Sequence, residues 1–118
     1  MKGRIRTSLS RWANASEQNA RDLREARDVS SDVAISDAPD REVVSLSGSI
    51  QTVTLRPRGG VPALEAELFD GTGSIVLVWL GRRRITGITP GRTVRAKGRI
   101  GRQDGFRVMF NPRYELMP

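Results

Sequence analysis

The sequence contains no cysteine and no histidine among its 118 residues. These absences exclude a disulfide framework, a Cys/His zinc site, a cysteine nucleophile and a histidine general base, and with them Ser-His-Asp catalysis. No stretch approaches the roughly 18 consecutive apolar residues of a membrane-spanning helix. Hydrophobic residues make up 37% of the chain, which is low for a globular protein but too high for a wholly disordered one. We therefore expect a soluble, cytoplasmic protein with one domain and an appendage, too short for a two-domain enzyme.

A recognisable catalytic constellation is also missing. Glu65 and Glu67 are paired carboxylates, but a pair exposed on one strand, without a pocket or metal-binding partners, is not a catalytic site. Gly71 and Gly73 do not form a phosphate-binding loop, because no helix follows them. We expect a protein that is not an enzyme and that needs no cofactor or metal.

Lysine is scarce: Lys2 and Lys97 are the only two among 20 basic residues, and 13 acidic residues leave a net charge of +7. Codon bias in a GC-rich genome and selection for bidentate phosphate binding would both produce this preference for arginine. The position of the charge is more informative. Residues 82–113 hold ten basic residues against the single acid Asp104, a local net charge of +9. This concentration is expected of a binding face for a polyanion.

Residues 1–40 differ in character from residues 41–118 and form the predicted appendage. Helix formers and few apolar residues predict a solvated helix over 8–28 that packs onto the domain through Trp12. The small, polar stretch 29–40 predicts a linker. No apolar stretch follows the basic start, so we expect no secretory signal, and the faint likeness of that start to an organellar transit peptide is an alternative.

From residue 41 onward the hydrophobic period changes to two, which predicts antiparallel strands without helices between them. A phase slip beside Gly48 predicts a bulged and strongly bent first strand. A tight hairpin is expected at 70–73, a long basic connection at 81–91 and a turn at 101–105. The five predicted strands cover 42–55, 64–69, 75–80, 94–100 and 106–110, the third being apolar on both faces.

Five short strands within 76 residues (41–116), with a bent first strand and glycines at the corners, predict a small closed barrel. Closure removes the sheet edges that an open sheet of this size would expose. The all-β, five-stranded OB-fold barrel with an N-terminal helical extension fits best. An SH3-like barrel is the competing topology.

Three stretches of the barrel carry a resemblance to a known family: DGTGSIVLVWLG (70–81), ITPGRTVRAKGRI (88–100) and MFNPRYEL (109–116). They resemble the tRNA-anticodon/helicase type of OB-fold, and most of all the wedge domain of RecG-type branched-DNA helicases. The resemblance covers about 42–116 and implies single-stranded or junction nucleic-acid binding on the outer face of the barrel. Without motor domains or a Walker-type GxxxxGK motif, the chain looks like a free-standing OB domain of small bacterial, actinobacterial-like proteins.

We expect cationic side chains to hold phosphates while one or two aromatic rings stack on bases, the combination that single-strand binders use. Because Glu65 and Glu67 face outward and repel phosphate, the path is expected to shift toward the 81–91 connection and the fourth strand. Two structural alternatives stay open: Trp79 could be a core residue, and acids of the N-terminal helix could neutralise the fourth strand. The predicted interface comprises Phe69, Trp79, Arg82, Arg83, Arg84, Arg95, Lys97, Arg99, Phe106 and Arg107.

The leading hypothesis is a protein that binds single-stranded or branched DNA or RNA with little sequence preference. The alternative is a protein-interaction module or accessory subunit that docks an acidic partner, suggested by the outward Glu65 and Glu67. Expected protein partners belong to DNA repair, recombination or RNA processing. Backbone charge and base faces are common to DNA and RNA, so the sequence does not choose between them, and it leaves the oligomeric state open.

Overall fold

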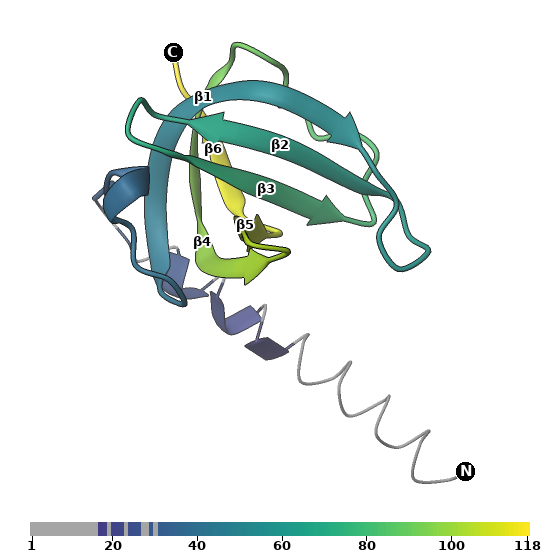
Figure 1. The fold of residues 1–118 in the computed structure, drawn as a ribbon, viewed down its shortest axis with the longest axis horizontal. Coiled ribbons are helices and arrows are strands. Elements are labelled where there is room, and N and C mark those ends of the chain that lie inside the picture. Colours follow the sequence, from purple (N-terminus) through teal and green to yellow (C-terminus); the bar gives the residue numbers. More distant parts are fainter. Residues whose placement is uncertain (1–16, 19, 23, 27–28, 30) are drawn as a thin grey trace, which may run out of the picture.

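The computed structural model describes residues 17–18, 20–22, 24–26, 29 and 31–118, which form one mostly β structure. All strands belong to one sheet with the order β1-β2-β3-β5-β4-β6, and an additional β1–β4 pairing closes it into a barrel (Figure 1). The elements are the 3₁₀ turn η1 (Ile35–Asp37) and the strands β1 (Val43–Leu55), β2 (Ala63–Phe69), β3 (Ser74–Leu80), β4 (Thr93–Gln103), β5 (Phe106–Phe110) and β6 (Arg113–Leu116).

Closure of the barrel depends on the long, curved strand β1, which forms an arc across the molecule (Figure 1). Its first half, 43–49, pairs with β4, and its second half, 49–55, pairs with β2. Gly48 lies beside the changeover, where a Cβ atom would come within 2.5 Å of the Phe69 carbonyl oxygen, so only glycine permits this approach. The register shifts between Ile50 and Val53, which confirms the predicted irregular first strand. On the opposite side, β3 and β5 pair in parallel.

The core fills the inside of the barrel with alternate residues of each strand, as the period of two requires. The two ends are closed by apolar side chains from outside the strands: Ile35 of η1, and Ile85 and Ile88 of the connection between β3 and β4. The largest fully buried side chains that the strands contribute to this core are Leu46, Ile50, Leu68, Ile75, Leu77, Val94, Ile100 and Met109.

All five predicted strands are present, and the structure adds a sixth. β6 pairs with β4 from Val94↔Leu116 to Lys97↔Arg113. Its four residues directly after Pro112 are too few to show a period of two, so the sequence pattern did not reveal it. The predicted turn at 101–105 was too long, because β4 continues to Gln103 and only Asp104 and Gly105 form the turn.

The N-terminal segment, defined as the described residues between positions 17 and 40, contacts the barrel at Asp22, Val29 and Val33. Positions 17–18, 20–22 and 24–26 are helical, while the rest of the predicted helix, including Trp12, lies outside the described residues. The stretch 32–40 is not a free linker: Val33 N donates to the Ser45 carbonyl at 3.0 Å, and Ile35 is fully buried. One apolar residue in a polar stretch has no periodicity, which is why the pattern suggested a linker. No helix in the described part is long and apolar enough to cross a membrane.

Candidate nucleic-acid interface

Arg95, on the predicted cationic face of β4, is held by an acid of the N-terminal segment. Its Nε donates to the two carboxylate oxygens of Asp32 at 3.0 and 3.1 Å, and its Nη1 lies 3.5 Å from a Glu115 oxygen. Asp32 also accepts hydrogen bonds from the hydroxyls of Ser45 and Ser47. Partial burial raises the pKa of Asp32, but the hydrogen bonds from the two serines and Arg95 outweigh it, so the pKa is lowered. The charge of Arg95 is therefore neutralised within the chain.

Lys97 and Arg99, the next two cations of the same face, also contact the N-terminal segment. Lys97 Nζ donates to the Val29 carbonyl at 3.0 Å. Arg99 donates from Nε to Asp22 at 3.0 Å, and its Nη2 lies 3.7 Å from Glu25. The hydrogen bond to Asp22 raises the pKa of Arg99. Asp22 and Glu25 of the predicted helix thus pair with Arg99, as one of the two structural alternatives anticipated, whereas Asp32, the acid that holds Arg95, lies in the predicted linker.

Arg107, another residue of the predicted interface, also holds the N-terminal segment in place. Its Nη1 donates to the Ile35 carbonyl at 2.7 Å and its Nη2 to the Ala38 carbonyl at 3.0 Å. Arg102 beside it donates to Asp40 at 2.7 Å, and this hydrogen bond lowers the pKa of Asp40. The side chain of Arg107 is only 17% exposed, so it serves the fold in this arrangement.

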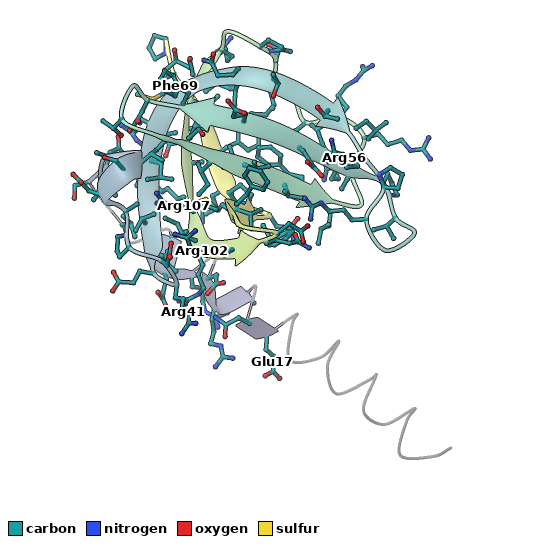
Figure 2. All side chains as sticks on the ribbon, viewed as in Figure 1. Glu17, Arg41, Arg56, Phe69, Arg102 and Arg107 are labelled. Atoms are coloured by element: carbon teal, nitrogen blue, oxygen red, sulfur yellow. The ribbon has the colours of Figure 1, made fainter. Side chains whose placement is uncertain are left out.

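Trp79 corrects the predicted list of aromatic contacts. Its ring is 5% exposed, its Nε1 donates to the Pro112 carbonyl at 3.2 Å, and it meets Tyr114 edge to face at 5.7 Å. A ring enclosed in this way offers no face to a base. Phe69 and Phe106 are exposed as predicted, at 43% and 68%. Figure 2 places Phe69 and Arg56 at opposite ends of the barrel, and Phe69 is not among the residues that line the groove described next.

The outer face of β2, β3 and β5 carries a groove with an apolar floor. Ala63, Val78 and Val108 form a small buried cluster on this face, outside the barrel core. This second cluster explains why β3 is apolar on both sides. The groove above it is lined by Arg56, Arg58, Glu65, Glu67, Ser74, Ile75, Val76, Gln103, Asp104, Phe106, Arg107 and Val108.

Arg58, from the loop between β1 and β2, reaches over this face. Its Nε donates to Glu65 at 2.9 Å, its Nη1 donates to the Gln103 side-chain oxygen, and its guanidinium lies 5.6 Å from the centre of the Phe110 ring. Glu65 is therefore paired with a cation, which removes much of its expected repulsion of phosphate. Sequence reasoning missed Arg56 and Arg58, although two arginines flanking a proline beside a Gly-Gly turn were a usable signal.

The triad Arg82–Arg84 is exposed at the end of the barrel where the β1–β2 loop also lies. The connection that carries it is fixed at both sides: Gly81 N donates to the Pro62 carbonyl at 2.7 Å, and Ile85 is buried in the core. None of the three guanidinium groups has an ion-pair or hydrogen-bond partner within the described part of the chain. Among the predicted cations, this triad is the group that stays available to a ligand.

Comparison with solved structures supports the barrel fold. The chain is similar to the OB domain of Ta0387 from Thermoplasma acidophilum, with a TM-score of 0.51 and 19% identity over 73% of this chain and 81% of that one. The barrel is of the OB type. The p204 HINb domain (TM-score 0.59, 16% identity) and RecG bound to a three-way DNA junction (0.56, 24%) are also similar to it.

These likenesses are matches of fold rather than of whole proteins. The match to the p204 HINb domain covers 74% of this chain and 47% of that chain. The match to RecG covers 67% of this chain and 11% of that chain. No protein-family model and no curated protein sequence matches the chain. The described residues contain no group of three or more His, Cys, Asp and Glu side chains that could hold a metal ion.

Proposed function

We propose that this OB barrel is a binding protein for single-stranded or branched nucleic acid, with little sequence preference. The observation that carries the proposal is the groove on β2, β3 and β5, where the exposed ring of Phe106 lies beside Arg56 and Arg58. The unpaired triad Arg82–Arg84 extends this positive surface at the same end of the barrel.

The chemistry of the groove suits a flexible strand. An exposed aromatic ring stacks on any base and is worth roughly 1–3 kcal/mol per base, while arginines hold phosphates by charge-assisted, bidentate hydrogen bonds. Neither contact reads base identity, so sequence preference is expected to be low. The similar structure of RecG bound to a three-way DNA junction supports the inclusion of branched DNA among the ligands.

The proposal is tested by fluorescence anisotropy with labelled single-stranded DNA, single-stranded RNA, duplex and a three-way junction, from about 50 to 300 mM salt. We expect single strands or the junction to bind more tightly than duplex, and log K to fall with log salt by about 0.7 per phosphate contact on a single strand. Absence of binding at the lowest salt would overturn the proposal and favour the docking of an acidic protein instead.

A double variant tests the contribution of the triad. Arg83→Ala with Arg84→Ala should weaken binding equally for all sequences and reduce the salt slope by about 1.4, because each lost phosphate contact removes about 0.7. The matched control is Arg92→Ala with Arg113→Ala, which removes the same charge from exposed positions outside the groove. If both double variants lose affinity to the same extent, general charge rather than the triad governs binding.

A further inference from the structure

Arg58 lines the groove, and its guanidinium lies over the neighbouring Phe110 ring, which could otherwise stack on a base. The guanidinium lies 5.6 Å from the centre of the Phe110 ring, and Phe110 is 39% exposed even with the cation above it. The guanidinium is held at two points, by Glu65 of β2 at 2.9 Å and by the side-chain oxygen of Gln103. In this arrangement Phe106 is the aromatic ring that lines the groove, and the nearby Phe110 ring is partly covered by the guanidinium.

We propose that Glu65 stands in for a nucleic-acid phosphate and holds Arg58 over Phe110 while the groove is empty. Binding then transfers the Arg58 guanidinium from the Glu65 carboxylate to a phosphate and uncovers Phe110 for a base. The inference rests on the proposed function, to which it adds the residue that controls affinity.

The exchange replaces one anion by another. Carboxylate and phosphate each present two oxygens that accept paired hydrogen bonds from a guanidinium. No covalent bond changes and no proton moves. The Arg58 and Glu65 side chains are 25% and 12% exposed, so an incoming phosphate reaches the guanidinium from the solvent side, while the carboxylate lies deeper. The Nη2 atom of Arg58 has no hydrogen-bond partner among the described residues, which leaves a donor for the first contact with a phosphate.

The same strand face offers a matched control for the charge of Glu65. Glu67 lies two residues further along β2, lines the same groove and is half-buried, but it has no ion-pair partner within the described ranges. Glu65→Gln and Glu67→Gln therefore remove the same charge from the same face. They differ in that only Glu65→Gln releases Arg58.

The experiment measures the affinity of the full chain and these two variants for a labelled single-stranded oligonucleotide by anisotropy at fixed salt. We expect Glu65→Gln to bind about threefold to fivefold more tightly than Glu67→Gln, the size of effect that one partly exposed ion pair produces. Equal gains in affinity in the two variants would mean that each carboxylate simply repels phosphate. Weaker binding by Glu65→Gln would mean that Glu65 orients Arg58 for the ligand. Either result overturns the inference.

A double-mutant cycle identifies Arg58 as the group through which Glu65 acts. In an Arg58→Ala background, the gain from Glu65→Gln should disappear. If the gain persists, Glu65 acts on the ligand directly and the inference is wrong. Thermal unfolding of each variant confirms that it is folded. Binding by the unmodified chain without a gain in Glu65→Gln would reject only the role of Glu65, whereas no binding by any of these proteins would reject the proposed function as well.

Discussion

Asp70 links the β2–β3 hairpin to the N-terminal segment through its two carboxylate oxygens. Oδ1 accepts hydrogen bonds from Thr72 N at 2.8 Å, Thr72 Oγ1 at 2.6 Å and Gly73 N at 3.2 Å, and Oδ2 accepts one from Ile35 N at 2.9 Å. Partial burial raises the pKa of Asp70, but these hydrogen bonds to the charged form outweigh it and lower the pKa from 3.8 to about 2. The carboxylate is thus more acidic in the folded chain than in the unfolded one.

This difference predicts a pH dependence of stability. A depressed pKa in the folded state stabilises the protein above the unfolded value of 3.8, and the contribution is lost as the pH falls from there through about 2. We expect Asp70→Asn to have a lower free energy of unfolding than the unmodified chain at pH 7. The difference in free energy of unfolding between the two proteins should narrow between about pH 4 and pH 2. Urea unfolding across this range measures it.

The control is Asp104→Asn, in the exposed turn between β4 and β5, where the carboxylate has no hydrogen-bond or ion-pair partner among residues 31–118. It should leave both the stability and its pH dependence unchanged. If the difference in free energy of unfolding between Asp70→Asn and the unmodified chain stays constant down to pH 2, the role of the Asp70 charge is contradicted.

Single residues also show how far a sequence pattern reaches. The period of two assigned Trp79 to the phase of Ile75 and Leu77, and that phase lies inside the barrel. The contact between Arg58 and Glu65 could not be predicted in the same way, because it depends on how the 56–62 loop folds back over the sheet. Alternation fixes the face of a strand residue, but it says nothing of a side chain that reaches in from a loop.

Among the elements, the 3₁₀ turn η1 and the short strand β6 are the two that the sequence pattern concealed. η1 contributes Ile35, which is fully buried in the main core, and Arg107 donates hydrogen bonds to the Ile35 carbonyl and to the carbonyl of Ala38, just after the turn. β1, β2 and β4 were predictable because each alternates apolar and polar residues, and β3 because it is a continuous apolar run. A three-residue turn with one buried side chain carries no such repeat, so its place became visible only in three dimensions.

The packing of η1 predicts that residues before position 41 contribute to the stability of the barrel. Ile35→Ala should lower the free energy of unfolding by about 2–5 kcal/mol, the usual cost of a cavity left by a buried isoleucine. Val33→Ala, two residues earlier and 38% exposed, should change it by less than about 0.5 kcal/mol. Urea unfolding of both variants makes the comparison, and equal losses would mean that η1 is not part of the folding unit.

At the scale of the whole molecule, the predicted cations, together with Arg56, Arg58 and Arg102, divide into two groups. Arg95, Lys97 and Arg99 on β4 meet acids and a carbonyl of the N-terminal segment, and Arg102 and Arg107 do the same nearby. The triad Arg82–Arg84 and the groove arginines face solvent or a single acid. The concentration of charge in 82–113 was visible in the sequence. Its division was not, because it depends on which acids the folded chain brings onto β4.

This division predicts that β4 contributes to stability rather than to nucleic-acid affinity. Arg95→Gln with Arg99→Gln leaves Asp32 and Asp22 without their cations, so the melting temperature should fall, by the modest amount that partly exposed ion pairs contribute. The slope of log K against log salt should stay at the value of the unmodified chain, because neither arginine is free to neutralise a phosphate. A slope reduced by about 1.4 would show that both arginines neutralise phosphates. The ligand would then displace the N-terminal segment from β4 and occupy the strand face that the sequence first indicated.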